Sequence, residues 1–240
     1  MPDEKLKKFA LWTYYKGALR DPGLDEGATT IAYVPEKGWF WYIPLPRNIV
    51  SVGIVAEKDY LYRDTHDPSS IFLREIENNP WIKRHLAPGR PCEPFRVTSE
   101  FSYRSRYCST DGLVLAGDAF GFLDPVFSSG LFLALMSGQN AGDAVDAALR
   151  KGNVTASQFT DYGKTFRQGI EAMRKLVYAF YDHEFNFRKF VDQYPNLKGD
   201  LTDCLIGNLL RDFKPLFKGI AEFTELPRAL SYGKPLKKIR

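Results

Sequence analysis

The sequence predicts an α+β fold: an antiparallel sheet domain over residues 1–108, a strand and a long helix over 109–152, and a helical region over 153–240. Before residue 108, apolar and polar residues alternate with a period of two in several runs, as in half-buried antiparallel strands. The run 113–116 is apolar at every position, as in a strand buried on both faces. Beyond residue 128 the apolar residues recur at helical spacing, so helices replace strands there.

The predicted sheet domain contains a three-stranded meander. Its strands cover residues 29–34, 39–45 and 49–56, and its turns cover the proline-containing segments 35–38 and 46–48. A helix is predicted from Ser69 to Asn78, because a serine suits its start and Pro80 follows its end. A further strand is predicted over residues 95–104.

The predicted helices come after the buried strand. Ser128 or Ser129 is placed to cap a helix that runs to about Arg150. A second helix begins near Thr155 and carries an apolar stripe through Phe180, which indicates core or a lid rather than a set of catalytic groups. Two shorter helices are predicted over 201–210 and 214–223.

Charge and composition exclude several classes of partner and site. The formal net charge of +4 comes from basic and acidic residues spread along the chain, so no nucleic-acid partner is expected. No apolar run is long enough to span a bilayer or follows the charged N-terminus as in a signal peptide, so neither membrane insertion nor export is expected. The odd, scattered set of three cysteines favours a reducing, cytoplasmic location. The three histidines are too dispersed to form a metal site.

The segment 112–130 is the strongest candidate for a ligand site. Asp118 comes just after the apolar run 113–116, at the carboxyl edge of the predicted strand, where ligands bind in open α/β sheets. Its carboxylate can accept hydrogen bonds from ligand hydroxyls, and the small residues beside it let a polyol lie close to the backbone. The next helix begins near Ser129, and its free N–H groups favour an anionic or electron-rich group. The pyrimidine edge of a flavin and a halide ion are both such groups.

Two segments resemble the flavin-dependent halogenases of the tryptophan halogenase type, which belong to the FAD-dependent monooxygenases with the hydroxybenzoate-hydroxylase fold. Residues 117–130, Gly-Asp-Ala-Phe-Gly-Phe-Leu-Asp-Pro-Val-Phe-Ser-Ser-Gly, are similar to the second flavin motif of that family. Residues 39–44, Trp-Phe-Trp-Tyr-Ile-Pro, resemble the WxWxIP signature that separates halogenases from hydroxylases. The similarity extends over about residues 10–190. On this basis residues 109–152 correspond to the last strand and helix of a FAD-binding domain. They follow, in sequence, the antiparallel sheet of a substrate domain.

The resemblance implies roles for particular residues. Asp118 would bind the ribityl hydroxyls of FAD, and Pro125 would lie against the isoalloxazine ring. The implied cofactor-binding set is Gly117, Asp118, Pro125, Gly130 and Leu131, the implied halide-binding pair is Ser129 and Gly130, and the implied substrate or tunnel wall is Trp39, Trp41 and Ile43. The last three alternate onto one face of the predicted strand 39–45.

The resemblance also implies a reaction. In the family, reduced FAD from a flavin reductase reacts with oxygen to a hydroperoxide, a halide ion attacks it, and the hypohalous species halogenates an organic substrate. For this chain the implied substrate is a small, electron-rich aromatic or pyrrole-like molecule. The implied enzyme is thus an oxidoreductase, a FAD-dependent halogenase or monooxygenase.

The sequence departs from the family pattern in two places. It contains no GxGxxG segment for the ADP half of FAD, and no lysine in a motif that matches the family's catalytic lysine. We therefore expect the chain to be the C-terminal part of such an enzyme, with no catalytic residue assignable. The isolated chain is expected either to bind FAD weakly or not at all, or to work only with a separate N-terminal half.

Several alternatives stay open at this point. Trp39 and Trp41 suit the core of a strand as well as a tunnel wall. Asp124 suits either a catalytic carboxylate or the turn before Pro125. For the whole chain, a FAD-dependent hydroxylase or reductase of the same fold is the alternative enzyme, and a non-catalytic remnant or binding module is the alternative to an enzyme.

Overall fold

The computed structural model describes residues 1–3, 5–34, 38–99, 102–208 and 211–236. Its contacts divide the chain into two compact units. Residues 4–101 form one, called here the sheet unit, and residues 1–3 with 102–240 form the other, called the helical unit. The α+β fold class is confirmed. The domain boundaries at 108/109 and 152/153 stay a prediction.

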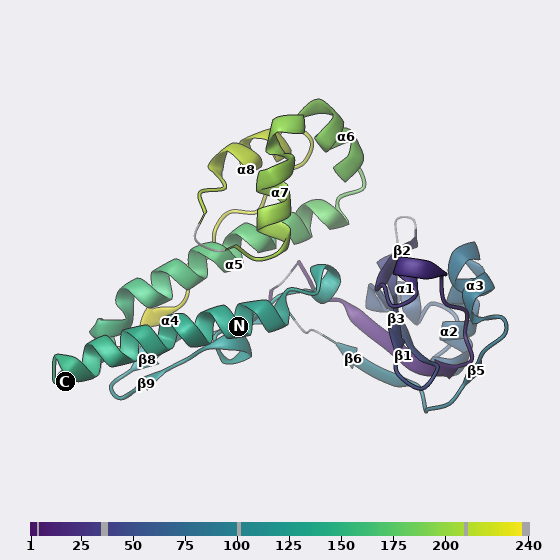
Figure 1. The fold of residues 1–240 in the computed structure, drawn as a ribbon, viewed down its shortest axis with the longest axis horizontal. Helices are drawn as coiled ribbons and strands as arrows, with labels where there is room; N and C mark the ends of the chain where they lie inside the picture. The colour runs from purple at the N-terminus through teal and green to yellow at the C-terminus, as the bar shows by residue number, and fades with distance from the viewer. Residues whose placement is uncertain (4, 35–37, 100–101, 209–210, 237–240) are drawn as a thin grey trace. The chain divides into compact units, whose positions relative to one another are not determined.

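The sheet unit contains a six-stranded antiparallel sheet (Figure 1). The strands are β1 (Phe9–Lys16), β2 (Thr30–Val34), β3 (Gly38–Leu45), β4 (Ile49–Ala56), β5 (Arg90–Pro91) and β6 (Arg96–Ser99). Their order is β2-β3-β4-β1-β5, with β6 also paired to β1. The predicted meander is therefore confirmed as β2, β3 and β4, although residues 35–37 of its first turn lie outside the described residues. The predicted strand over 95–104 divides into β6 and β7 (Tyr103–Arg104), which belong to different units.

Helices pack on one face of this sheet, and aromatic side chains line the other. Phe40 on β3 and Phe72 on α2 (Pro68–Glu77) belong to the core between sheet and helices, with ring centroids 6.0 Å apart. On the opposite face the Trp41 ring lies 6.0 Å from that of Trp39 and 6.3 Å from that of Trp12. Gly53 on β4 leaves room for this row, because a Cβ there would lie 2.4 Å from the Trp41 ring.

Two further short helices complete the sheet unit, α1 (Lys58–Leu61) and α3 (Pro80–Leu86). The sequence pattern placed the end of a helix before Pro80, and α2 does end there. However, Pro80 also occupies the first turn of α3, where a missing N–H costs nothing, and the Asn79 side chain caps this helix by accepting the Ile82 N–H at 3.0 Å. The pattern missed α3 because proline was taken only as a helix terminator.

The helical unit is built around two long helices, α4 (Gly130–Arg150) and α5 (Thr160–Tyr181), which run side by side (Figure 1). The smaller helices α6 (Phe187–Gln193), α7 (Lys198–Leu205) and α8 (Lys214–Ile220) pack with the C-terminal part of α5 in one apolar cluster. Short strands complete the unit: β8 (Tyr107–Thr110), β9 (Leu113–Val114) and β11 (Lys234–Pro235) form one sheet, and β7 pairs with β10 (Gly121–Phe122). The two long predicted helices after residue 128 are thus confirmed. Of the two shorter ones, α7 covers 198–205 instead of 201–210, and α8 ends at Ile220 instead of 223; residues 209–210 lie outside the described residues.

The predicted strand 113–116 is the main correction to the expected fold. Only β9 is strand, it pairs antiparallel with β8 alone, and Leu113 is half exposed. Val114 beside it is only half buried, so the described elements do not cover both faces of β9, and the expectation of burial on both faces was wrong. The next residue, Leu115, is held from the other side, because the Tyr162 hydroxyl on α5 donates to its carbonyl oxygen at 2.7 Å.

The apolar stripe predicted between Thr155 and Phe180 forms the core of the helical unit. Phe166, Ile170 and Met173 on α5 are buried among the residues of one cluster. Among the described residues no helix is long and apolar enough to cross a bilayer, and no group of three or more potential ligand side chains could hold a metal ion.

Candidate functional site

The turn that carries Asp118 is fixed by the backbone of Gly117 and by α4. Residues Gly117–Ala119 form a single 3₁₀ turn, which begins with Gly117 in the left-handed region at φ 54°. A Cβ at Gly117 would also lie 3.3 Å from Cβ of Ala134, so the position favours glycine on two grounds. The Gly117 N–H donates to Oγ of the buried Ser137 at 2.7 Å, and that hydroxyl donates to the Ala134 carbonyl oxygen at 3.0 Å. The turn is therefore tied to α4 by one side chain.

Asp118 and Ala119 are exposed on this turn, whereas Phe120 anchors it in the core. The Phe120 ring is fully buried and lies 4.8 Å from that of Phe166 on α5. The Ala119 carbonyl oxygen accepts a hydrogen bond from Oγ of Ser105 at 2.7 Å. Phe120 and Ser105 therefore fix the turn on its buried side, and the Asp118 carboxylate is left exposed to a ligand.

Asp124 shapes the loop before α4. Its side chain is almost fully buried, and its two carboxylate oxygens accept the Val126 N–H at 3.1 Å and the Tyr181 hydroxyl at 2.8 Å. These bonds position Pro125 at the start of the 3₁₀ turn Pro125–Phe127. The structure therefore supports the turn-forming role of Asp124 over a catalytic one.

The start of α4 presents free backbone donors. Ser128 has a left-handed backbone, at φ 52°, which turns the chain into the helix. Ser129 occupies the N-cap position, but its side chain makes no capping hydrogen bond there. A Cβ built on Gly130 would meet no heavy atom within 4 Å, so open space lies beside the first backbone N–H groups of the helix. The helix dipole makes this end favourable for negative charge.

A hollow of about 30 Å³ lies between the Asp118 turn and the start of α4. The structure brings together there five predicted site residues: Gly117, Asp118, Pro125, Ser129 and Gly130. The lining residues do not include Leu131, whose side chain is 75% exposed. The role of each residue in ligand binding stays a prediction. The sequence analysis missed Ser137. The signal available was its spacing, because it lies four residues from both Leu133 and Ala141 on the apolar face of α4.

The predicted tunnel residues lie on β3 in the sheet unit. Trp41 is half buried, its indole N–H donates to Oγ of Ser51 at 3.1 Å, and its ring packs over Gly53. Trp39 is buried and Ile43 is half buried on the same strand face. These contacts support the packing role of the tryptophans, and the tunnel role stays a prediction.

Replacing Ser137 by alanine tests how the Asp118 turn is held. The Ser137→Ala variant leaves the buried Gly117 N–H without its acceptor, so we expect the free energy of unfolding to fall by about 1–3 kcal/mol. Urea titration followed by far-UV ellipticity measures this. Ser157→Ala serves as a control, since the Ser157 hydroxyl makes only an exposed contact with Thr155. Equal stability of the two variants would show that the turn does not depend on Ser137.

With this geometry established, comparison with known proteins identifies the family. The family model for tryptophan halogenases matches residues 20–189, which is more than half of the chain. The chain belongs to the tryptophan halogenase family. The predicted family is thereby confirmed, and the matched range contains both segments on which the prediction was based.

Individual relatives of this halogenase-family chain are halogenases that act on different substrates. A 1H-pyrrole-2-carbonyl-[peptidyl-carrier protein] brominase of Pseudoalteromonas luteoviolacea is 31% identical over 84% of the chain and 49% of its own length. A tryptophan 2-halogenase of Chondromyces crocatus is 32% identical over 75% of the chain and 34% of its own length. The chain therefore spans about half, or less, of the length of the relatives that it matches.

Solved structures agree with the family assignment. The structure of a flavin-dependent brominase matches with a TM-score of 0.81 and 27% identity, over 93% of this chain and 55% of that one. The myxobacterial chondrochloren halogenase, a FAD-dependent halogenase, matches with a TM-score of 0.67 and 27% identity, over 90% of this chain and 54% of that one. Which part of these enzymes the halogenase-family chain corresponds to stays a prediction.

Proposed function

We propose that this chain provides the ribityl and ring side of the FAD site of a flavin-dependent halogenase, and that a separate nucleotide-binding part completes the site. The observation that supports this most directly is the convergence of three features on one hollow. These are an exposed carboxylate at Asp118, a left-handed glycine at Gly117 and the open N-terminus of α4 at Gly130. The family match and the halogenase relatives give the reaction class.

In this proposal the chain binds and orients the cofactor. Asp118 accepts hydrogen bonds from the ribityl hydroxyls, and Gly117 lets the polyol approach the backbone because it carries no Cβ. Pro125 presents a rigid apolar surface for the ring, and N–H groups at Gly130 and Leu131 donate to its pyrimidine edge. When bound in reduced form, FAD supplies, with oxygen, the oxidant that converts halide into electrophilic halogen.

The hollow beside Gly130 suits the halide. Its volume of about 30 Å³ admits one or two species of the size of water, so in this proposal the flavin ring lies outside it, over the exposed Pro125 and Gly130. Ser129 and Gly130 line it at the positive end of the α4 dipole. A chloride or bromide ion held there would be close to both the Asp118 turn and the start of the helix.

An exposed apolar face on α4 supports the need for a further polypeptide part. Leu131, Leu135 and Leu149 are 75%, 65% and 63% exposed, and the exposed Gly138 and Gly142 lie between them. Such a face on a globular protein is typical of a surface that another element covers. We propose that a nucleotide-binding N-terminal half packs there, and that FAD binds weakly to the chain alone.

The remaining partners follow from the family chemistry. A flavin reductase supplies reduced FAD, and an electron-rich aromatic or pyrrole-like molecule accepts the halogen. The names of two relatives specify a pyrrole-2-carbonyl group on a peptidyl-carrier protein as their substrate. We place the reaction in the cytoplasm, where the free thiols of Cys92, Cys108 and Cys204 stay reduced. No residue of the described chain is assigned to proton or halogen transfer.

The role of Asp118 is tested by FAD binding. We expect the chain mixed with the nucleotide-binding half of the Pseudoalteromonas brominase to bind FAD, and the chain alone to bind it at least tenfold more weakly. Asp118→Ala is expected to weaken binding by the mixture about 10- to 100-fold, since it removes charge-assisted hydrogen bonds. Flavin fluorescence titration measures the affinity. Asp143→Ala, which removes an exposed carboxylate on α4, is expected to change it less than twofold.

Three outcomes would contradict the proposal. Tight, stoichiometric FAD binding by the chain alone would remove the need for a second half. Absence of FAD binding by the mixture would identify a non-catalytic remnant. If FAD binds but an assay with NADH, a flavin reductase, bromide and a pyrrole substrate gives only hydroxylated product, the chain is part of a hydroxylase.

A further inference from the structure

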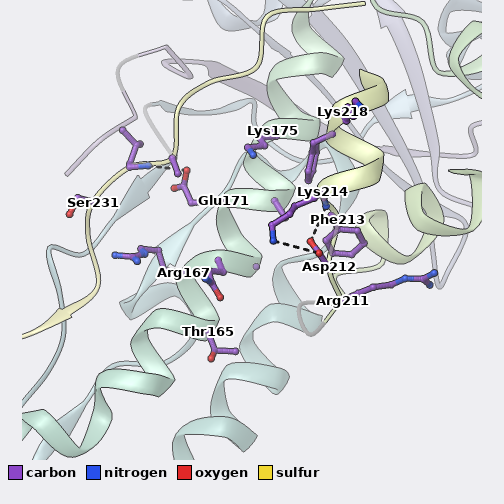
Figure 2. Close-up of a pocket in the computed structure, with 16 residues that line it drawn as sticks. Thr165, Arg167, Glu171, Lys175, Arg211, Asp212, Phe213, Lys214, Lys218 and Ser231 are labelled. Atoms are coloured by element: carbon purple, nitrogen blue, oxygen red, sulfur yellow. Dashed lines mark hydrogen bonds and ion pairs between the residues drawn. The ribbon is translucent and has the colours of Figure 1, made fainter. Parts of the chain in front are cut away.

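A second and much larger cavity, of about 970 Å³, lies entirely within the helical unit (Figure 2). Its walls come from α5, from α8 with the residues just before it, and from residues 229–231. None of its lining residues belongs to the flavin-motif segment 112–130. Its volume is at the upper end of the range of about 300–1,000 Å³ that is usual for small-molecule sites.

Cationic side chains from two helices line this cavity. Arg167 and Lys175 are eight residues apart on α5, and Lys214 and Lys218 are four residues apart on α8. Residues at these spacings share one helix face, so each helix directs two cations toward the cavity. In Figure 2 Lys214 reaches from α8 back toward α5, and Arg167 extends on the side of residues 229–231.

The carboxylates at the cavity offset only part of this charge. Glu171 is already bound, since it lies 3.3 Å from Nη1 of Arg174 and accepts the Leu230 N–H at 3.1 Å. Asp212 lies 3.7 Å from Nζ of Lys214. Among the described residues no carboxylate lies within ion-pair distance of Arg167, Lys175 or Lys218. The cavity therefore carries an excess of positive charge that attracts anions.

Aromatic rings form part of the same wall. Phe213 and Phe217 lie with their ring centroids 6.4 Å apart, and Nζ of Lys175 lies 4.8 Å from the Phe217 centroid. Both rings are more than nine-tenths buried, so they form the base of this wall, and the half-buried Ala172 and Leu230 provide its open apolar surface. An inorganic ion would use the cations and leave that open surface in contact with water. A molecule with both an anionic and an apolar part would use both.

We infer that this cavity binds an organic phosphate. The phosphate group would lie between Arg167, Lys175 and Lys214. The apolar part would lie against Ala172 and Leu230. One N–H group of Arg167 donates to the Tyr232 carbonyl oxygen at 3.1 Å, which fixes the guanidinium and leaves its other N–H groups for the ligand. A phosphate monoester carries up to two negative charges, so it offsets more of the cationic excess than a carboxylate does.

Isothermal titration calorimetry of the full chain with 1-naphthyl phosphate, without FAD, tests this inference. We expect one saturable site per chain, with binding at least tenfold tighter than that of inorganic phosphate or neutral 1-naphthol. The Lys175→Gln/Lys214→Gln double variant is expected to bind 1-naphthyl phosphate at least tenfold more weakly. The Lys151→Gln/Lys164→Gln variant, which removes the same charge from exposed positions outside the cavity, should stay within twofold of the parent chain.

The control measurements show whether binding depends on the phosphate group and on the two lysines of the cavity. Equal binding of 1-naphthol would show an apolar pocket without anion recognition, and equal weakening by both double variants would show only a general charge effect. Either result, or the absence of saturable binding, would overturn the inference. If the Lys175 change disturbs folding, Lys214→Gln alone must still weaken binding several-fold, because Lys214 is exposed and contacts only Asp212 in the described part of the chain.

Discussion

Arg174→Met is expected to lower the free energy of unfolding of the helical unit by about 3–5 kcal/mol. Arg174 on α5 is buried together with two acidic side chains: its Nε lies 2.5 Å from Oδ2 of Asp3, and its Nη1 lies 3.3 Å from Oε2 of Glu171. It also donates to the Tyr178 hydroxyl at 3.0 Å. The methionine side chain fills much of the volume but removes the guanidinium that contacts two buried carboxylates. Urea titration followed by far-UV ellipticity measures the loss.

Arg150→Met is the matched control for this prediction. Arg150 on α4 lies 2.8 Å from Asp146, but both side chains are mostly exposed, so the same change should cost less than about 0.5 kcal/mol. The double variant Glu171→Gln/Arg174→Met should recover part of the stability, because it also removes the negative charge of the buried Glu171 side chain. If the two single variants at Arg174 and Arg150 proved equally stable, the buried network would not hold this unit together.

The contacts between Arg174 and Asp3 also connect to the flavin-motif segment 117–130, through β7 and β10. The Asp3 N–H donates to the Ser102 carbonyl oxygen at 2.9 Å, next to β7. β7 pairs with β10, which lies within the segment 117–130, through Tyr103 opposite Phe122. Loss of Arg174 should therefore loosen the loop between Asp118 and α4 before the rest of the unit unfolds.

The second large effect is expected at Glu75 in the sheet unit. Glu75 on α2 is fully buried and accepts hydrogen bonds from the Tyr60 hydroxyl at 2.5 Å and Nε of Arg74 at 2.7 Å; Arg63 lies within 2.8 Å. Glu75→Gln keeps the volume but removes the charge that these donors share. We expect the sheet unit to lose about 3 kcal/mol at pH 7, measured by native-state hydrogen exchange of α2 peptides against urea.

This loss should depend on pH in a defined way. Burial alone would raise the pKa of Glu75, but the hydrogen bonds from Tyr60, Arg74 and Asn78 outweigh it, and the pKa lies below its usual value. The ionised carboxylate therefore contributes its full stability above the ordinary pKa of a glutamate, and the contribution disappears as the pH falls through the lowered value. The difference in stability between parent and Glu75→Gln should shrink over that acidic range. A difference that stayed constant there would contradict the assignment.

Local patterns predicted much of this structure. The meander could be predicted because its alternation and turns lie within residues 29–56. The position of α4 could be predicted from the serine and glycine residues at its start, although Ser129 makes no side-chain capping hydrogen bond there. Five of the predicted flavin-site residues meet at one hollow for the same reason: they are close in the sequence.

The features that could not be predicted depend on contacts between distant segments. Arg174 and Asp3 are 171 positions apart, and nothing in either neighbourhood indicates the other. The exposure of Leu113 depends on whether a distant segment covers its face of β9, which the apolar run does not encode. The basic cavity likewise requires α5 and α8 to face each other, although each looks like an ordinary amphipathic helix in sequence.

The row of tryptophans across β1 and β3 has a spectroscopic consequence. All four tryptophans of the chain, Trp12, Trp39, Trp41 and Trp81, lie in the sheet unit, and none lies in the helical unit. Three of their indole rings lie 6.0 and 6.3 Å from the next, close enough for exciton coupling, and the fourth stacks on His85 at 3.6 Å. Tryptophan emission thus reports on the sheet unit alone, so the unfolding of that unit can be followed separately without any label.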